Sequence, residues 1–431
     1  MSELARRLTL PDILCLGVNA IIGSGIFLFP GKLATVAGPT SIFAFVLCGF
    51  LLVTVALCYA EMAGLTQRNG GSYIYALTAF GPKVGFVVGW MAWVTSIFSW
   101  AAVANAISSQ LAWFHPVFNG TLATKILAVS LILGFGTVNY FGVKMGALTV
   151  NFFTLAKTLP LAIFVGIGLF HIKMGNFQGA LNTDMNTLGA AIFLSLWPLQ
   201  GFETTPVVAG ESKNPRRDVP LATVGSLLAV ALFYTLIQIV AVGSFDGLAG
   251  SKKPLADAAA SFMGPLGATL MAAGAAISMT GYSAGNAMGS ARYLEALAED
   301  RFLPQWLKGI HPKYFTPARA IVITMSLTAF MAIWLDFNAL VDISNLAVIS
   351  QYSSTCLAVI WLRIKQPNLE RQFKIPGGIF LPVLACLVSA WLIKQVKLPE
   401  LIFTICVVLI GIGIAFASRK WDARQGVLSE N

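Results

Sequence analysis

Three groups of residues in this sequence could do chemistry, and each interrupts a long apolar run. The first is the Gly-Ser-Gly segment 23–25. The second is Trp197–Glu203, followed closely by Pro206, and the third is Lys157. A backbone that leaves the helix exposes N–H and C=O groups that can bind charged ligands. A lysine within an apolar run must find carbonyl partners or lose its proton.

The residue types at the two backbone interruptions explain why a helix would stop there. Proline removes a helix N–H and clashes with the preceding turn, and glycine leaves the helical region at little cost. In lipid an unpaired backbone group costs several kcal/mol, so irregular backbone survives only where protein or a water-filled cavity satisfies it. The interruptions therefore indicate a binding site enclosed by neighbouring helices.

The composition places these residues in a membrane protein. Of 431 residues, 57% are hydrophobic and 11% are charged, whereas a soluble domain has about 25% charged residues. The mean hydropathy is +0.78. An all-α protein with about twelve transmembrane helices is predicted, since about 20 apolar residues cross a bilayer. The predicted spans are 12–37, 40–64, 84–113, 123–142, 146–170, 187–210, 220–243, 263–298, 317–335, 339–364, 377–396 and 399–418.

The net charge of +10 comes from loops on one side of the membrane. With a cytoplasmic N-terminus, most of the 28 lysine and arginine residues fall in cytoplasmic loops. This positive-inside pattern predicts a multi-pass protein of the cell (inner) membrane with both termini in the cytoplasm, and argues against nucleic-acid binding. Glu61, near a cytoplasmic helix end, is expected to pair with a basic loop residue such as Arg68.

The sequence lacks the motifs of metal sites, cofactor sites, hydrolytic enzymes and ATP-driven pumps. The six cysteines stand singly and the three histidines are scattered, so neither a metal site nor a cofactor is predicted. No HExxH, GxSxG or P-loop pattern occurs, so we expect neither an enzyme nor an ATP-driven pump.

The spacing of the interruptions predicts the architecture. The interrupted spans, 12–37 and 187–210, stand five spans apart, which indicates a unit of five helices used twice. Because five is odd, the second copy enters from the opposite side and the repeat is inverted. The chain 1–431 is predicted to be one transport domain. Its parts are a first repeat at 12–172, a second at 187–365, two further helices at 377–418 and a cytoplasmic tail at 419–431.

Four ordered motifs resemble the amino acid–polyamine–organocation transporters over residues 8–330. The resemblance implies a leucine-transporter-like fold with five-plus-five inverted repeats and broken helices 1 and 6. The motifs are Gly23-Ser24-Gly25-Ile26-Phe27, Gly70-Gly71-Ser72-Tyr73-Ile74-Tyr75 before Phe80-Gly81-Pro82, Gly201-Phe202-Glu203 with Lys213-Asn214-Pro215, and Gly285-Asn286-Ala287 with Arg292.

A zwitterionic amino acid needs both ends of a broken helix. Its carboxylate suits N–H donors at a helix N-terminus, and its ammonium suits carbonyls at a C-terminus. Ser24 and Gly25 would supply the donors, and Gly23 would let the ligand approach the backbone. By resemblance, the carbonyls of Ile21, Trp197 and Gln200 would hold the ammonium. Close helix packing is the alternative role for the glycines.

Residues of the second interruption are expected to gate or couple transport. The resemblance implies that Trp197, and less directly Phe202, closes over the substrate, while packing is the alternative for both. Glu203 is an ionisable residue at membrane depth. It either carries a proton or accepts N–H bonds that hold the broken helix.

Lys157, a charged residue in the middle of an apolar span, is the single residue that most strongly indicates a functional role. The resemblance implies that its ammonium takes the place of a sodium ion between spans one, five and eight. Its partners would be the backbone of 17–20 and Ser283, and a purely structural or snorkelling lysine is the alternative.

Further contact positions implied by the resemblance are Thr95, Ser96, Trp100 and Asn286, with Ser344 or Asn345 as additional candidates.

Several functional interpretations remain open at this point. The first is a secondary active transporter of L-amino acids, small or medium neutral ones favoured, that is H⁺-coupled or sodium-independent. The second is an exchanger for cationic amino acids or polyamines, and the third is a channel or receptor. The expected partners are the substrate, H⁺ and the lipid bilayer, in a monomer or homodimer.

Overall fold

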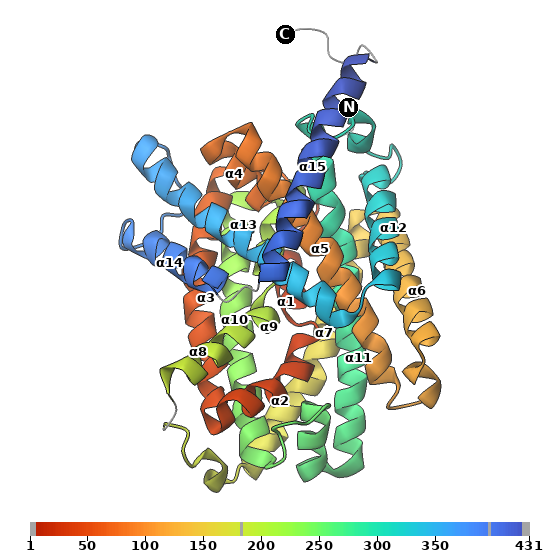
Figure 1. The fold of residues 1–431 in the computed structure, drawn as a ribbon, viewed down its shortest axis with the longest axis vertical. Coiled ribbons are helices and arrows are strands. Elements are labelled where there is room, and N and C mark those ends of the chain that lie inside the picture. Colours follow the sequence, from red (N-terminus) through yellow and green to blue (C-terminus); the bar gives the residue numbers. More distant parts are fainter. Residues whose placement is uncertain (1–5, 182–183, 395–397, 425–431) are drawn as a thin grey trace.

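The computed structural model describes residues 6–181, 184–394 and 398–424, and these residues form an all-helical bundle (Figure 1). The helices are α1 (Leu10–Ile21), α2 (Gly25–Ala37), α3 (Ile42–Leu65), α4 (Ser72–Phe80), α5 (Pro82–Leu111), α6 (Thr121–Tyr140), α7 (Val143–Gly168), α8 (Met185–Leu194), α9 (Leu196–Leu199), α10 (Pro215–Ser244), α11 (Pro254–Glu299), α12 (Ala318–Trp334), α13 (Phe337–Lys365), α14 (Phe380–Lys394) and α15 (Leu398–Arg424).

The helix boundaries follow the predicted spans closely. Eight stretches within the described residues are long and apolar enough to cross a membrane, and four apolar helices are shorter. Two of the shorter ones, α1 and α8, are parts of interrupted spans. The count of twelve spans and the inverted repeat stay predictions. Of the predicted tail 419–431, residues 425–431 lie outside the described residues.

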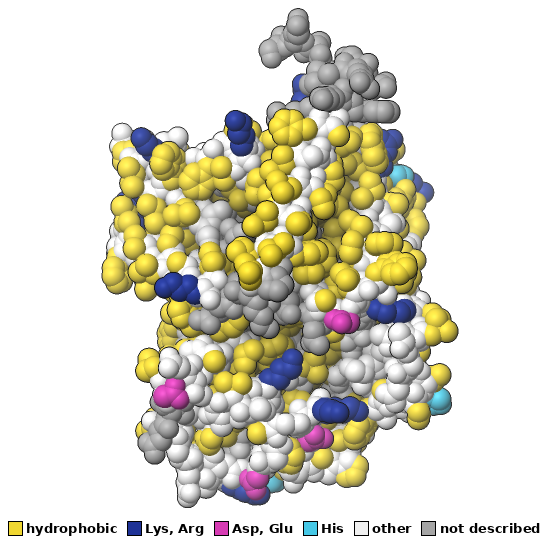
Figure 2. Space-filling model, viewed as in Figure 1, with side chains coloured by type: hydrophobic (Ala, Val, Ile, Leu, Met, Phe, Trp, Pro, Cys, Tyr) yellow, Lys and Arg dark blue, Asp and Glu magenta, His cyan; other side chains and the backbone are white. Residues whose placement is uncertain are grey.

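The outer surface of the bundle is apolar. Figure 2 shows hydrophobic side chains covering much of the face formed by α13, α14 and α15, with few charged groups among them. Large hydrophobic residues are exposed on several helices, including Phe50 at 66% and Leu122 at 73%. Water would disfavour such a surface, whereas lipid tails match it, as expected for a membrane-embedded bundle.

Both interrupted spans are broken at the predicted residues. Helix α1 begins where the Asp12 carboxylate accepts bonds from the Thr9 amide (2.9 Å) and hydroxyl (2.7 Å), and it ends at Ile21. The chain resumes as α2 at Gly25. In the second span, α8 and α9 are followed after Gln200 and Gly201 by a 3₁₀ segment, Phe202–Glu211.

Neighbouring helices surround the first break. Helix α1 packs against α7, α10, α11 and the 3₁₀ segment, and Figure 1 shows it within the bundle. Helix α11 bends at Gly264, which has φ of +63° and precedes Pro265. That bend lies close to residue 263, the predicted start of the eighth span.

A buried ion pair connects several helices near the N-terminal segment. Arg292 donates to the Glu211 carboxylate (3.0 Å) and to the Asn139 amide oxygen (3.1 Å). Both charged side chains are fully buried. The backbone of Leu8 also donates to the Glu211 carbonyl at 2.9 Å. These contacts join α6, α11 and the 3₁₀ segment to the start of the chain.

Glu61 pairs with basic residues, as expected, but Arg68 is not one of them. Glu61 instead pairs with Arg363 of α13 (2.5 Å) and with Arg371 (3.2 Å). Arg68 pairs with Asp300 (2.9 Å) and Glu299 (3.2 Å). Burial lowers the pKa of Arg68, but these carboxylates outweigh it and hold the pKa above its usual value. The sequence could not identify these partners because they lie far apart in the chain.

Candidate functional site

The two helix breaks lie against each other. A Cβ atom on Gly25, at the start of α2, would come within 2.7 Å of the Pro198 Cα in α9. Gly201 has φ of +127°, and a Cβ atom there would lie 2.5 Å from the carbonyl of Ala20 in α1. Only glycine permits both the backbone angle and this approach. The glycines therefore let two irregular backbones meet inside the bundle.

A small cavity of about 20 Å³ lies between the breaks. That volume is close to the room that one water molecule needs. The site therefore has no room for an amino acid in this structure, and one would bind only after the walls move apart. The lining residues are Ala20, Ile21, Gly23, Ser24, Gly25, Val103, Trp197, Gln200 and Tyr282.

Hydrogen-bond donors at one side of this cavity have no protein partner. The Ser24 hydroxyl is buried and makes no hydrogen bond with any described residue. Ser24 also caps α2, whose first N–H groups have no partner within the helix. The helix dipole makes this end positive. The cavity thus offers an anion a hydroxyl and a helix N-terminus.

Carbonyl groups lie at the other side. The Ile21 carbonyl accepts bonds from the Tyr234 hydroxyl (3.2 Å) and from the Gly23 amide (2.9 Å). Gln200 lines the cavity, and its side-chain amide donates to the Asn345 amide oxygen at 2.7 Å. The negative ends of α1 and α9 therefore face a space that also receives the N-terminus of α2.

Lys157 of α7 is fully buried, and its side chain reaches the C-terminal end of α1. Its Nζ donates to the Asn19 carbonyl oxygen (2.9 Å) and to the Ile22 carbonyl. The Ser278 hydroxyl of α11 donates to the carbonyls of Ile22 (3.2 Å) and Gly23 (3.0 Å). Lys157 and Ser278 together satisfy the carbonyls that the break leaves open, so α7 and α11 hold the end of α1.

The Glu203 carboxylate accepts hydrogen bonds at the second break. Its Oε2 accepts from the Gly201 amide (2.9 Å) and from the Tyr352 hydroxyl (3.0 Å). The first bond closes the turn in which Gly201 has positive φ. The second ties the turn to α13. This geometry provides the structural role that the sequence left open beside proton carriage.

Comparison with known proteins identifies the type of molecule. Residues 8–417 match the protein family described as amino acid permease. The chain belongs to the amino acid permease family. It is therefore a multi-pass membrane transporter, and its resemblance to the amino acid–polyamine–organocation transporters is confirmed.

Three relatives match this permease over nearly its whole length. The branched-chain amino acid permease BcaP of Bacillus subtilis (strain 168) is 28% identical, over 97% of this chain and 94% of that protein. The methylthioribose transporter of the same organism is 25% identical, over 95% and 92%. Its serine/threonine exchanger SteT is 27% identical, over 97% and 98%.

The predicted contact residues of α5 do not line the cavity of this permease. The Thr95 hydroxyl accepts from the Gln351 amide (3.1 Å), and the Ser96 hydroxyl donates to the Trp93 carbonyl (2.7 Å). The Trp100 indole N–H is buried without a partner among the described residues. Val103 is the residue of α5 that lines the cavity. When a helix is apolar on every side, its sequence does not show which of its faces is turned toward the cavity.

Helix α11 presents a different face than the sequence interpretation assumed. The Ser283 hydroxyl donates to the Met279 carbonyl of its own helix (3.2 Å), and the Asn286 amide donates to the Tyr282 carbonyl (3.4 Å). Ser278 contacts the break and Tyr282 lines the cavity. Positions 278 and 282 stand four residues apart and so share one face of the helix.

The two candidate aromatic gates differ in position. Trp197 lines the cavity and is 8% exposed. Phe202 instead stacks on Tyr352, with ring centroids 5.3 Å apart, and meets the edge of Tyr59 at 5.8 Å. Phe202 thus packs with rings of α3 and α13, outside the cavity lining.

Proposed function

We propose that this permease carries L-amino acids across the cell membrane by alternating access, with the substrate bound between the two helix breaks. The observation that carries the proposal is the unpartnered Ser24 hydroxyl beside the N-terminus of α2, opposite the carbonyl ends of α1 and α9. This arrangement suits a carboxylate and an ammonium on one ligand. The family membership supports it.

Movement of the cavity walls is part of the proposed cycle. The cavity of about 20 Å³ has room for about one water. Trp197 lines it and is the side chain that we propose as the gate. We also propose the architecture that the sequence predicts, which has twelve spans in inverted repeats. Both termini lie in the cytoplasm, and the protein is a monomer or homodimer in the membrane.

Neutral amino acids of small or medium size are the proposed substrates. No aspartate or glutamate is among the residues that line the cavity, so a cationic side chain would find no carboxylate there. The relative BcaP is named for branched-chain amino acids. An exchanger is the second candidate, because the relative SteT is named as a serine/threonine exchanger.

Coupling to H⁺ without sodium is proposed through Lys157. Its ammonium contacts the carbonyls of Asn19 and Ile22, which a bound cation would otherwise coordinate. Loss of its proton would remove the positive charge and one of the three N–H donors, which would weaken its bonds at the end of α1. That change would loosen α1 where it borders the substrate cavity.

Ser24→Ala tests the carboxylate site. We expect the KM for the preferred amino acid to rise about tenfold or more, because a hydrogen bond to a charged group contributes about 1.5–3 kcal/mol. The measurement is concentration-dependent uptake into proteoliposomes. Ser353→Ala is the control, since the Ser353 hydroxyl bonds the Ile349 carbonyl of its own helix. An unchanged KM in Ser24→Ala would remove this hydroxyl from the proposed site.

Glu203→Gln separates the two roles of Glu203. The glutamine carbonyl can accept both bonds that Oε2 now accepts. We expect uptake within about fivefold of wild type, the cost of exchanging charged for neutral hydrogen bonds, and a retained response to the pH gradient. Uptake that no longer responds to the gradient would assign the transported proton to Glu203.

A further inference from the structure

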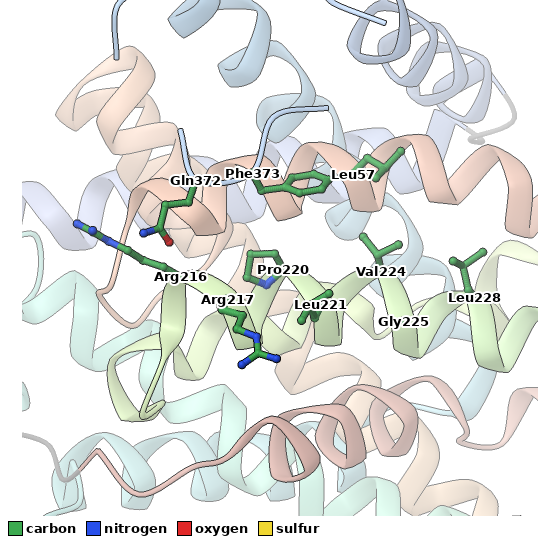
Figure 3. A pocket seen from close by; sticks show the side chains of 10 residues that line it. All are labelled: Leu57, Arg216, Arg217, Pro220, Leu221, Val224, Gly225, Leu228, Gln372 and Phe373. Carbon is green, nitrogen blue, oxygen red and sulfur yellow. The ribbon is translucent and has the colours of Figure 1, made fainter. Parts of the chain in front are cut away.

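A large groove lies on the outer surface of the bundle, away from the substrate cavity. It has a volume of about 630 Å³ and runs between α10, α3 and the segment before α14. Figure 3 shows Arg216 and Gln372 at one end, and Val224 and Leu228 of α10 toward the other. The remaining lining residues are Leu57, Arg217, Pro220, Leu221, Gly225 and Phe373.

The two ends of the groove differ in chemistry. The side chains of Arg216 and Arg217 are exposed, and no acidic side chain in the described part of the chain pairs with them. The nearby Glu211 carboxylate is committed to Arg292. Figure 3 shows the Arg216 and Arg217 side chains extending from α10 in different directions. Each unpaired guanidinium group can bind a phosphate through several N–H donors.

Beyond the arginines the groove is apolar. Leu221 is 51% exposed and Leu228 is 40% exposed. Gly225, between them, also lines the groove. Twelve residues separate Arg216 from Leu228, so this wall is about 18 Å long at 1.5 Å per residue. One leaflet of the hydrocarbon core is about 15 Å deep, so the groove matches the depth of one leaflet.

We propose that this groove binds one anionic phospholipid, with its phosphate on Arg216 and Arg217 and an acyl chain between α3 and α10. Charge complementarity selects this occupant, because a helix of a second copy would bury the arginines without offering a phosphate. The position of the arginines at a helix start, where polar loops begin, sets the headgroup at the membrane surface.

The test is native mass spectrometry of the full-length protein with added phosphatidylglycerol or phosphatidylcholine of matched chains. Wild type is expected to retain phosphatidylglycerol preferentially. Arg216→Ala/Arg217→Ala is expected to weaken that binding roughly 10- to 30-fold, the effect of two basic residues near an anionic lipid. Arg216→Lys/Arg217→Lys should weaken it less. Lys308→Ala/Lys313→Ala, which removes the same charge from exposed positions elsewhere, should leave it unchanged.

A second variant tests the apolar part of the groove. Val224→Trp should fill it and weaken phosphatidylglycerol binding while the arginines remain. Equal retention of both lipids by wild type, or equal loss in the Lys308/Lys313 control, would overturn the proposal. Full displacement of the lipid by glycerol phosphate, which has no acyl chain, would also overturn it and leave an anion site only.

Discussion

Lys157→Ala is expected to abolish the dependence of amino-acid uptake on an inward pH gradient and to reduce uptake more than tenfold. The substitution removes the Lys157 donor from the Asn19 carbonyl and leaves the Ile22 carbonyl with the Ser278 hydroxyl alone. Leaving a buried acceptor unsatisfied costs about 1–3 kcal/mol, so the end of α1 should loosen. Uptake into proteoliposomes with and without the gradient, together with thermal unfolding in detergent, measures both effects.

Lys125→Ala provides a matched control for this experiment. The Lys125 Nζ also donates to carbonyls at a helix end, those of Ala332 (2.6 Å) in the last turn of α12 and Leu335 (3.0 Å) just after it. The Asn105 amide donates to the same two carbonyls (3.1 and 3.2 Å). The Lys125 contact lies away from the two breaks, so its loss should lower stability without changing the response to the gradient. Equal responses to the gradient in wild type and Lys157→Ala would refute coupling through Lys157. The lysine would then only hold the fold.

Gly201→Ala is expected to eliminate uptake and to destabilise the protein. Its Cβ atom would lie 2.5 Å from the Ala20 carbonyl, which is backbone and cannot move aside as a side chain can. The φ of +127° adds strain for any residue with a Cβ atom. Together these effects cost about 2–6 kcal/mol. Thermal unfolding and uptake at equal protein density are the measurements.

Gly166→Ala is the control for the glycine substitution. Gly166 lies in α7, and no atom lies within 4 Å of its added Cβ. Alanine is about 1 kcal/mol more favourable than glycine within a helix, so uptake should persist and stability should hold or rise. A Gly201→Ala protein with wild-type uptake and stability would contradict the close contact between α1 and the second break.

The sequence predicted the broken helices because the causes of a break are local. Glycines at 23 and 25 and Pro198 with Gly201 disfavour a continuous helix whatever surrounds them. Lys157 was identifiable for a similar reason, since a charge in an apolar run needs a partner. Its contact with the carbonyl of Asn19 falls within the segment 17–20 that the resemblance implied.

Helix rotation and distant pairing were harder to predict. Thr95, Ser96 and Trp100 were placed at the cavity, but Val103 lines it instead. Ser278, rather than Ser283, contacts the first break. In a helix that is apolar on every side, hydrophobic periodicity does not mark the inward face. The partner of Glu61 depends on tertiary packing that no local pattern records.

The central claim is that the two helix breaks form a carrier site for amino acids. The most direct test is uptake of radiolabelled neutral L-amino acids into proteoliposomes containing the purified wild-type protein. The account predicts uptake that saturates with substrate concentration, is competed by unlabelled L-amino acids and is lost in Gly201→Ala. Uptake of methylthioribose or polyamines without any saturable uptake of amino acids would contradict it.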